Sequence, residues 1–226
     1  MRGVFVTGTD TGVGKTLAAC ALVHALRARG LRVAPMKPVA AGAIAHGDGW
    51  ANEDTLALAA AAGAGAPTLG EITPVLLREP MAPHVAAARE GREIALEALV
   101  QAHRRLAAAT DFTVVEGVGG FLVPLAPSFD ARDLAVALGL PVVLVVGLRL
   151  GCLNHALLTA ESVRGAGLRL AGWIANAIDP AMAVPGENVA ALRERLPAPL
   201  LGRFPHAPGA DAAELAGRLD LSPLLG

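Results

Sequence analysis

The sequence predicts an α/β fold in which a mostly parallel sheet carries helices on both faces. Three observations lead to this expectation. Short apolar runs alternate along the chain with longer segments of helical periodicity, which is the pattern of parallel sheets. The apolar runs contain few alternating polar residues, so both of their faces should be covered. Glycine follows several helical segments, as at Gly30, Gly139 and Gly165, where it can end a helix.

Each expected element is a segment with one dominant pattern. The expected strands are short apolar runs bounded by turn-forming residues, at 3–8, 32–38, 111–117, 141–147, 170–176 and 199–204. The expected helices lie between them, at 15–29, 53–62, 94–109, 130–138, 153–165 and 187–196. No linker is long enough to divide the chain, so residues 1–226 should form a single domain.

The bulk properties exclude several classes of partner. The chain has 226 residues and a net charge of −1, which gives no electrostatic basis for binding nucleic acid or a membrane surface. The longest apolar stretch, 134–148, is interrupted by Gly139 and Pro141 and is shorter than the ~20 residues of a membrane span. No signal peptide is recognisable. We expect a soluble, cytoplasmic protein, with His103 on a helix surface and Cys20 as a reduced core thiol.

Four segments rich in glycine, proline and aspartate follow the ends of expected strands. They are 8–14, 37–50, 117–129 and 147–154. In open parallel sheets, ligands bind beyond the carboxyl ends of the strands. We therefore expect all four loops to face one cleft.

The first of these loops has the pattern of a nucleotide site. The stretch "VTGTDTGVGKT" leads from a strand ending at Gly8 to a helix beginning at Lys15. Backbone N–H groups at such a helix start bind phosphate, Gly12 and Gly14 allow the tight backbone, and Thr16 offers a hydroxyl to Mg²⁺. We therefore expect a fold similar to that of the P-loop NTPases. The spacing between the first glycine and the lysine is one residue longer than usual. The alternative for this loop is a glycine-rich turn that binds no ligand.

Charged residues after other strands are candidate partners of this loop. Glu116 ends an apolar strand and is followed by a glycine-rich segment, so it can reach the cleft as a carboxylate for the metal. Lys37 lies between an apolar strand and Pro38, where it can be a second cation for anionic intermediates. The alternatives are a solvated acid and a surface lysine. One of Asn52 to Asp54 should cap the helix that begins there.

Several segments, in this order, resemble the dethiobiotin synthetase family. They are "VTGTDTGVGKT", "KPVAAG", "NEDTLAL", "EPMAPH", "VVEGVGGFLVPL", "LPVVLVVGLRLGCLNHALLTAE" and "LAGWIAN". The resemblance covers roughly residues 3 to 206. The phosphate loop of the family also carries its first glycine one residue early, which accounts for the unusual spacing here.

The resemblance implies an enzyme that joins 7,8-diaminopelargonate and CO₂ with ATP, through a carbamate and a carbamic–phosphoric anhydride. It implies catalytic roles for Thr11, Lys15 and Lys37, and Mg²⁺ ligation by Thr16, Asp54 and Glu116. It implies ATP contacts from Gly12, Val13, Gly14, Lys15, Thr16, Leu17, Glu116, Gly117, Val118, Gly119, Asn176, Pro205, His206 and Ala207. Asn176 would read adenine through its side-chain amide.

The resemblance also implies a substrate site completed by a second subunit. Substrate contacts would come from Lys37 and Ala41, from the helix start Gly151, Cys152, Leu153 and Asn154, and from Asn188. The protein would be a homodimer. Three positions depart from the family pattern: Gly12 often corresponds to an acidic residue, Ala41 to serine and Asn188 to tyrosine. These departures concern substrate affinity more than the type of reaction.

Three other classes of function are alternatives. A partitioning or positioning ATPase of the same fold would use ATP as a switch, but such proteins usually carry an additional lysine early in the loop. Positions 8–14 contain none. An amidating cobyrinate-type ligase would bring a glutaminase region, for which this chain has no room. A non-catalytic nucleotide-binding module would not need Lys15, Lys37 and Glu116 together.

Overall fold

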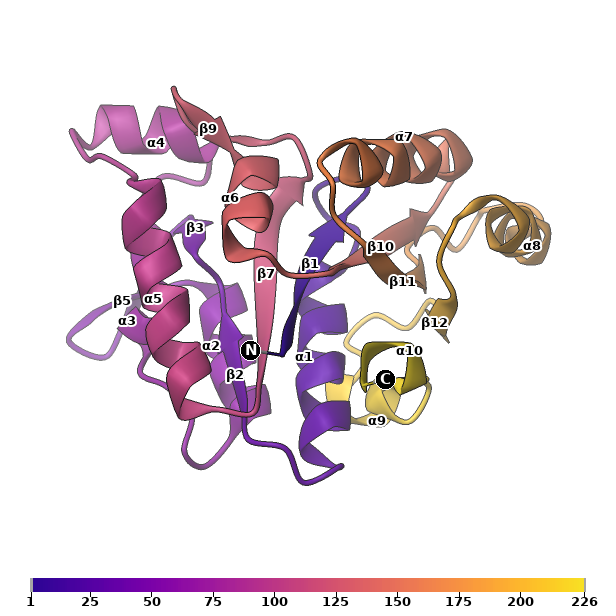
Figure 1. Cartoon of the computed structure of the whole chain (residues 1–226), viewed down its shortest axis with the longest axis horizontal. Helices are drawn as coiled ribbons and strands as arrows, with labels where there is room; N and C mark the ends of the chain where they lie inside the picture. Colours follow the sequence, from indigo (N-terminus) through magenta and orange to yellow (C-terminus); the bar gives the residue numbers. More distant parts are fainter. Residues whose placement is uncertain (1, 226) are drawn as a thin grey trace.

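A computed structural model describes residues 2–225 of the chain. Six strands of this part form one sheet in the order β12-β11-β10-β1-β7-β2, and every neighbouring pair is parallel (Figure 1). The strands are β1 (Gly3–Gly8), β2 (Val33–Met36), β7 (Phe112–Gly120), β10 (Val142–Leu148), β11 (Leu170–Ala177) and β12 (Leu200–Phe204). Each overlaps one of the six segments predicted as strands, so the parallel α/β sheet is confirmed.

The six predicted helices are also present. They are α1 (Lys15–Arg27), α2 (Glu53–Ala62), α5 (Leu96–Ala109), α6 (Ala131–Leu138), α7 (Cys152–Gly165) and α8 (Pro185–Arg195). The boundaries follow local signals. Helix α6 begins at a capping box between Asp130 and Asp133 and ends at Gly139, which has a φ of 64°. The apolar stretch 134–148 is therefore a helix end, a turn and a buried strand.

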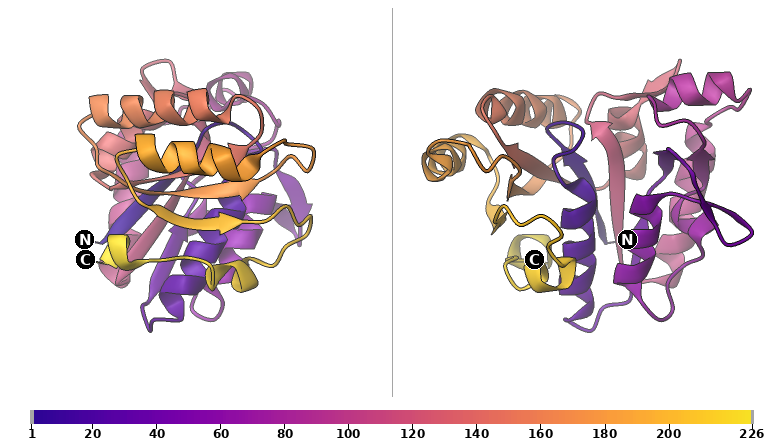
Figure 2. Two further views of the ribbon diagram at one scale, coloured as in Figure 1. Left: turned by 90° about the vertical axis from the view of Figure 1, so that its right-hand side faces the viewer. Right: turned by 180° about the vertical axis from the view of Figure 1, so that it is seen from behind.

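Helices cover both faces of the sheet because successive residues of its central strands point in opposite directions. Val4 and Val6 of β1 pack in a cluster with Leu22 of α1, whereas Phe5 packs on the other face with Leu134 of α6. Figure 1 views the face that carries α5 and α6, and the right-hand view of Figure 2 shows α1 lying across the opposite face. This two-sided burial explains the continuous apolar strands of the sequence.

The elements missing from the sequence prediction are all short. Two small sheets pair β3 (Val39–Ala41) with β6 (Val75–Leu77) and β4 (Ile44–His46) with β5 (Gly49–Ala51). A third pairs β8 (Pro124–Ala126) with β9 (Phe129–Asp130). The short helices are α3 (Leu69–Ile72), α4 (Pro83–Arg89), α9 (Ala212–Ala216) and α10 (Ser222–Leu225). Segments of two to seven residues are too short to show a reliable period.

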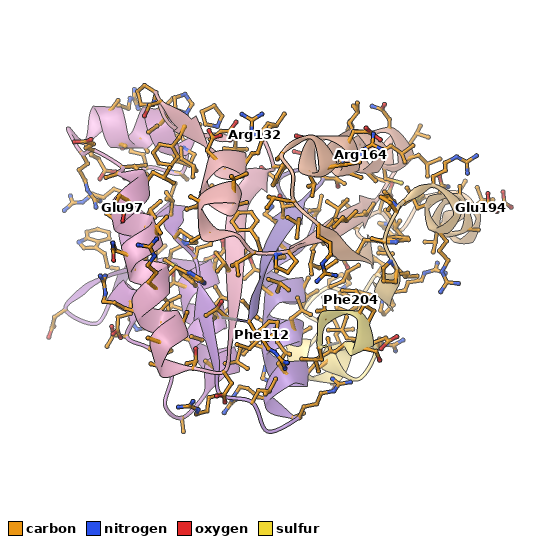
Figure 3. All side chains as sticks on the ribbon, viewed as in Figure 1. Glu97, Phe112, Arg132, Arg164, Glu194 and Phe204 are labelled. Atoms are coloured by element: carbon orange, nitrogen blue, oxygen red, sulfur yellow. The ribbon has the colours of Figure 1, made fainter. Side chains whose placement is uncertain are left out.

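Burial follows the expected pattern with one exception. Figure 3 shows the charged side chains of Glu97 and Glu194 at the periphery, and Phe112 and Phe204 inside. The expectation that His103 lies at the surface is wrong, because the residue is 3% exposed and its Nε2 lies 3.0 Å from the Thr113 hydroxyl. Burial lowers the pKa of His103, so the imidazole is a neutral core group. Within residues 2–225, no helix combines the length and the apolar character needed to cross a membrane.

The order of the strands positions the site. Strand β1 lies between β7 and β10. The strands that follow it in sequence, β2 and β7, lie on one side of β1, and the later strands β10, β11 and β12 lie on the other side. A reversal of this kind leaves a crevice at the carboxyl end of the central strand. The loop between β1 and α1 begins at that point, so the fold places the predicted phosphate loop in the crevice.

Candidate active site

The loop between β1 and α1 has the backbone of a phosphate-binding turn. Gly12 and Gly14 have φ angles of 73° and 86°, in the left-handed region that favours glycine. Gly14 is the N-cap of α1, where a Cβ would collide with the side-chain amide of Asn176. Glycine at this position lets the Asn176 side chain pack directly against the start of α1. Such a helix start favours an anion.

Asp10 organises the interior of this loop. Its backbone carbonyl accepts a hydrogen bond from the Lys15 ammonium, with an Nζ–O distance of 3.0 Å. Its carboxylate accepts the Thr11 N–H at 2.7 Å and is paired with the Arg149 guanidinium, which follows β10. The hydrogen bond from Thr11 and the pairing with Arg149 hold the pKa of Asp10 below its ordinary value. The loop is thus tied within itself and to the next strand of the sheet.

Opposite the loop, Lys37 joins two carboxylates at the floor of the crevice. Its Nζ donates to Glu116 Oε1 at 2.6 Å, to Asp54 Oδ2 at 2.8 Å and to the Gly117 carbonyl at 3.2 Å. Thr16 Oγ1 lies 2.8 Å from Asp54 Oδ1 and 2.9 Å from Glu116 Oε1, so its single proton can bond either carboxylate. Asn52 caps α2, which confirms the prediction that one of Asn52 to Asp54 would be the cap, and Asp54 lies in the first turn of this helix. The functional placements of Lys37 and Glu116 are therefore favoured over surface positions.

The two lysines differ in their electrostatic surroundings. Lys37 is 3% exposed, and although burial opposes its charge, Glu116 and Asp54 raise its pKa above the ordinary value. Burial also opposes the charge of Asp54, but Lys37 holds the pKa of that carboxyl low. Lys15 donates to the Asp10 carbonyl, and burial together with the charge of Lys37 lowers its pKa to about 8. Both lysines are therefore charged near pH 7, but Lys15 loses its proton at a much lower pH than Lys37.

A hollow of about 690 Å³ connects these groups. Its lining includes eleven of the residues proposed from the sequence: Thr11, Gly12, Gly14, Lys15, Thr16, Lys37, Ala41, Asp54, Glu116, Val118 and Gly119. Sequence reasoning assigned no role to the remaining lining residues, which are Ala40, Pro80, Met81, Ala82, Pro83 and Val123. The segment "EPMAPH" was part of the family resemblance, and this was the one signal that pointed to 80–83 as a wall of the site.

The donor set of the floor fits a magnesium ion. Glu116 is 1% exposed, and its Oε2 is one of the buried side-chain atoms without a hydrogen-bond partner in residues 2–225. Oxygen is the ligand that Mg²⁺ prefers, and Asp54, Glu116 and Thr16 all supply it. The described chain contains no group of three or more His, Cys, Asp or Glu residues that could form a closed metal cage. Mg²⁺ commonly keeps several waters and phosphate oxygens instead of such a cage.

Several predicted nucleotide contacts lie outside the lining of this hollow. The side chain of Val13 is buried in the core beside α1, Leu17 packs against the same core, and Gly117 contributes a carbonyl to Lys37. Asn176 is 6% exposed and donates to the Val13 carbonyl at 2.9 Å, so one N–H of its amide already supports the loop. Pro205, His206 and Ala207 are exposed, and His206 Nδ1 lies 3.2 Å from the Ala177 carbonyl.

The four loops differ in how they meet this hollow. Loops 8–14, 37–50 and 117–129 contribute to the lining, but 147–154 does not. The side chain of Cys152 is buried in a core cluster and its N–H donates to the Arg149 carbonyl, whereas Asn154 is exposed. Asn188 donates to the Val184 carbonyl at 3.1 Å. Arg149 of the same segment nevertheless pairs with Asp10, so 147–154 meets the phosphate loop at the edge of the site.

Comparisons with known proteins identify the family of this chain. A family model described as an AAA domain matches residues 2–214. The ATP-dependent dethiobiotin synthetase BioD of Aromatoleum aromaticum is 54% identical over 220 residues, which cover 97% of each chain. The protein of the same name from Ralstonia nicotianae is 55% identical over 221 residues, covering 98% of this chain and 96% of the relative.

Solved structures of more distant proteins share the fold. The septum site-determining protein MinD of Pyrococcus horikoshii, solved with Mg-ADP, has a TM-score of 0.59 at 16% identity and covers 95% of this chain and 92% of its own. The cell division ATPase MinD of Pyrococcus furiosus has a TM-score of 0.56 at 17% identity, covering 96% and 95%. At this identity the likeness establishes the P-loop NTPase fold alone.

Proposed function

The chain belongs to the dethiobiotin synthetase family, whose members are ATP-dependent ligases of biotin synthesis, and on this premise we propose its substrates and mechanism. The enzyme closes the ureido ring of dethiobiotin from 7,8-diaminopelargonate and CO₂, converting ATP into ADP and phosphate. One observation carries the proposal. The phosphate loop faces a second buried cation, Lys37, across a hollow of about 690 Å³ that also contains Asp54 and Glu116.

The proposed reaction has three steps. One amine of the diamine attacks CO₂ and loses a proton, which gives a carbamate. A carbamate oxygen attacks the γ-phosphorus of ATP, the bond to the β–γ bridging oxygen breaks, and ADP leaves. The second amine attacks the carbonyl carbon of the carbamic–phosphoric anhydride, the bond to phosphate breaks, and loss of a proton completes the ring. These steps need in-line positioning and neutralisation of negative charge more than covalent help from the protein.

The side chains of the hollow suit these needs. Lys15 would bind the β- and γ-phosphates together with the backbone of Thr11 and Gly12. Lys37 would bind the carbamate and the transferred phosphoryl group. Because Lys37 donates to three protein acceptors in this structure, its ammonium has to exchange at least one of them for a substrate oxygen. Ala41 offers only its backbone to the substrate, where many relatives would offer a hydroxyl.

A magnesium ion would be held by Thr16, Asp54 and Glu116. When bound, it would offset charge on the phosphate oxygens of ATP. The unpartnered Glu116 Oε2 supports this assignment, since a buried carboxylate oxygen normally has a partner. The adenine would lie beyond the loop, against Asn176 and Pro205 to Ala207. The second N–H and the oxygen of the Asn176 amide would then contact the base.

We also propose that the enzyme is a homodimer with shared substrate sites. Leu150, Leu158 and Val184 are 96%, 61% and 54% exposed, and all three belong to α7, α8 or the turns that lead into them. A two-fold interface would cover this apolar patch on both subunits. The helix start at Gly151 to Asn154, which does not line its own hollow, would then bind the substrate carboxylate of the partner's site, with Asn188 nearby.

Light scattering tests this assembly. A dimer should have about twice the monomer mass of 22.8 kDa at micromolar concentration, and a mass of one chain would contradict it. If the sites are shared, mixing Lys37→Ala with a second inactive variant, Asn154→Asp, should restore part of the activity in heterodimers. Self-contained sites would regain none.

The decisive assay for the proposed function measures phosphate release from ATP. Release should depend on both diaminopelargonate and bicarbonate, and mass spectrometry should find dethiobiotin in equal amount. ATP hydrolysis that ignores the diamine would contradict the proposal. Stimulation by DNA or lipid vesicles instead would favour the partitioning-type ATPase.

A further inference from the structure

Asn52 is a buried polar residue that the proposed mechanism does not use. It lies between β5 and α2, two positions before Asp54, and is 8% exposed. It is not among the residues that line the hollow. Its surroundings nevertheless connect it to two walls of the site.

The side-chain amide of Asn52 forms bonds in two directions. Its Oδ1 accepts the N–H of Asp54 at 3.0 Å, which caps α2 at the residue that carries the metal-binding carboxylate. Its Nδ2 donates to the carbonyls of Ala41 and Gly42, both at 3.2 Å. One side chain therefore links the start of α2 to the turn that follows β3.

Both ends of this link lie at the hollow. Ala41 and Asp54 are lining residues, and the turn beside Ala41 is constrained because Gly42 has a φ of 85°. A Cβ on Gly42 would lie 3.2 Å from the Cβ of Pro80, another lining residue. The side chain of Asn52 thus holds both the Ala41 backbone, which faces the proposed substrate, and Asp54, which faces the proposed metal. Other side-chain caps, such as Asp211 on α9, bond only the helix that they begin.

We propose that Asn52 is a positioning residue that holds the Ala41 wall and Asp54 in register. The proposal rests on the function proposed above for the identity of the substrate and for the metal-binding role of Asp54. An amide is required because the site needs an acceptor and two N–H donors on one short side chain. A carboxylate of the same shape would still cap α2, but it would place its second oxygen against two carbonyl oxygens and next to Asp54.

This difference makes Asn52→Asp the discriminating variant. It keeps the volume and the cap but removes the link to Ala41 and Gly42. Asn52→Ala removes both. The matched controls are Asp211→Asn and Asp211→Ala, which alter a cap of the same kind on α9, a helix that contributes no lining residue.

The first measurement needs no substrate turnover. Calorimetry on the full-length protein gives the affinity for ADP with and without Mg²⁺, and the ratio reports how well Asp54 serves the metal. We expect Asn52→Asp and Asn52→Ala to reduce this ratio at least threefold, while ADP affinity without Mg²⁺ stays within twofold of the parent. Both Asp211 variants should keep the parental ratio even where they lower the melting temperature.

The second measurement is steady-state kinetics with diaminopelargonate. Displacement of the Ala41 wall should raise the KM for diaminopelargonate about tenfold in both Asn52 variants, with a smaller change in the KM for ATP. A folded Asn52→Asp protein with the parental Mg²⁺ effect on ADP and the parental KM would overturn the proposal, as would equal losses in the Asp211 controls. If the parent itself makes no dethiobiotin, the proposed function fails, but the calorimetric ratio still decides the role of Asn52.

Discussion

The two walls of the hollow are assembled in different ways. The phosphate loop, residues 8–16, owes much of its shape to contacts between near neighbours, such as Lys15 with the Asp10 carbonyl five residues away. The facing wall, formed by 37–54 and 80–83, depends on contacts between distant residues. Lys37 donates to Glu116 and to the Gly117 carbonyl, which are 79 and 80 positions away. The phosphate loop should keep its conformation when residues elsewhere are replaced. The facing wall should lose its arrangement when one of its bonded side chains is removed.

The difference has a physical origin. The phosphate loop is shaped by backbone conformation, with glycines at positive φ before a helix N-terminus. The facing wall is held by the buried ammonium of Lys37, whose charge is stabilised by the buried Glu116 and the partly exposed Asp54. The following predictions test this contrast, beginning with the largest expected effect.

Replacing Lys37 by alanine should have the largest effect. The site would lose the cation that offsets charge on the carbamate and phosphoryl oxygens, so turnover should fall by about three orders of magnitude. The free energy of unfolding should fall by about 3–5 kcal/mol, because Glu116 stays buried without its partner. Calorimetry should still detect ADP binding, since the phosphate loop does not depend on this wall. Lys37→Arg controls for charge, and near-normal turnover of Lys37→Ala would remove Lys37 from the mechanism.

Replacing Glu116 by glutamine should have the next largest effect. The amide has nearly the same shape but cannot supply a charged oxygen to the metal, so turnover should fall about a hundredfold. The Mg²⁺ concentration for half-maximal activity should rise, and circular dichroism should confirm that the chain remains folded. A Mg²⁺ titration identical to that of the parent would show that Glu116 does not hold the ion.

The pH dependence of nucleotide binding tests the phosphate loop itself. Burial and Lys37 lower the pKa of Lys15 to about 8, and bound phosphates should raise it again. Below pH 8 the lysine is charged in both states, so affinity should be constant near pH 7. Above pH 8 binding must take up a proton, and ADP affinity should fall by up to about tenfold per unit. Lys15→Arg should abolish this slope; a flat profile of the parent up to pH 9.5 would refute the assignment.

The Arg149→Ala variant should show the smallest effect. Arg149 ties Asp10 of the loop to the segment after β10, but its side chain is 41% exposed and that of Asp10 is 47% exposed. Exposed pairs contribute about 0.2–1 kcal/mol, so ADP affinity should fall by no more than about fivefold, and less in high salt. Arg164→Ala, which removes an exposed pair within α7, is the matched control. A loss above tenfold would mean that the loop is not self-supporting.

Sequence reasoning located most of the site because strand ends and chemistry coincide there. The phosphate loop follows the carboxyl end of β1 and Lys37 follows that of β2, whereas Glu116, expected at a strand end, lies in the middle of β7 because this strand continues to Gly120. Sequence reasoning did not distinguish the loops that line the hollow from 147–154, which meets the phosphate loop through Arg149 instead. It also assigned no role to Asn52 beyond a cap, because its bonds to Ala41 and Gly42 depend on a hairpin of three-residue strands.

By itself, the sequence determined the parallel sheet, the covering helices and the conformation of the phosphate loop. These depend on periodicity and on the φ angles that glycine allows, which are properties of short segments. Only the tertiary structure decided that the Lys37 ammonium bonds Glu116, Asp54 and the Gly117 carbonyl together, and that Asn52 supports two walls. Such contacts join residues from separate elements, and their geometry exists only once the sheet has brought those elements together.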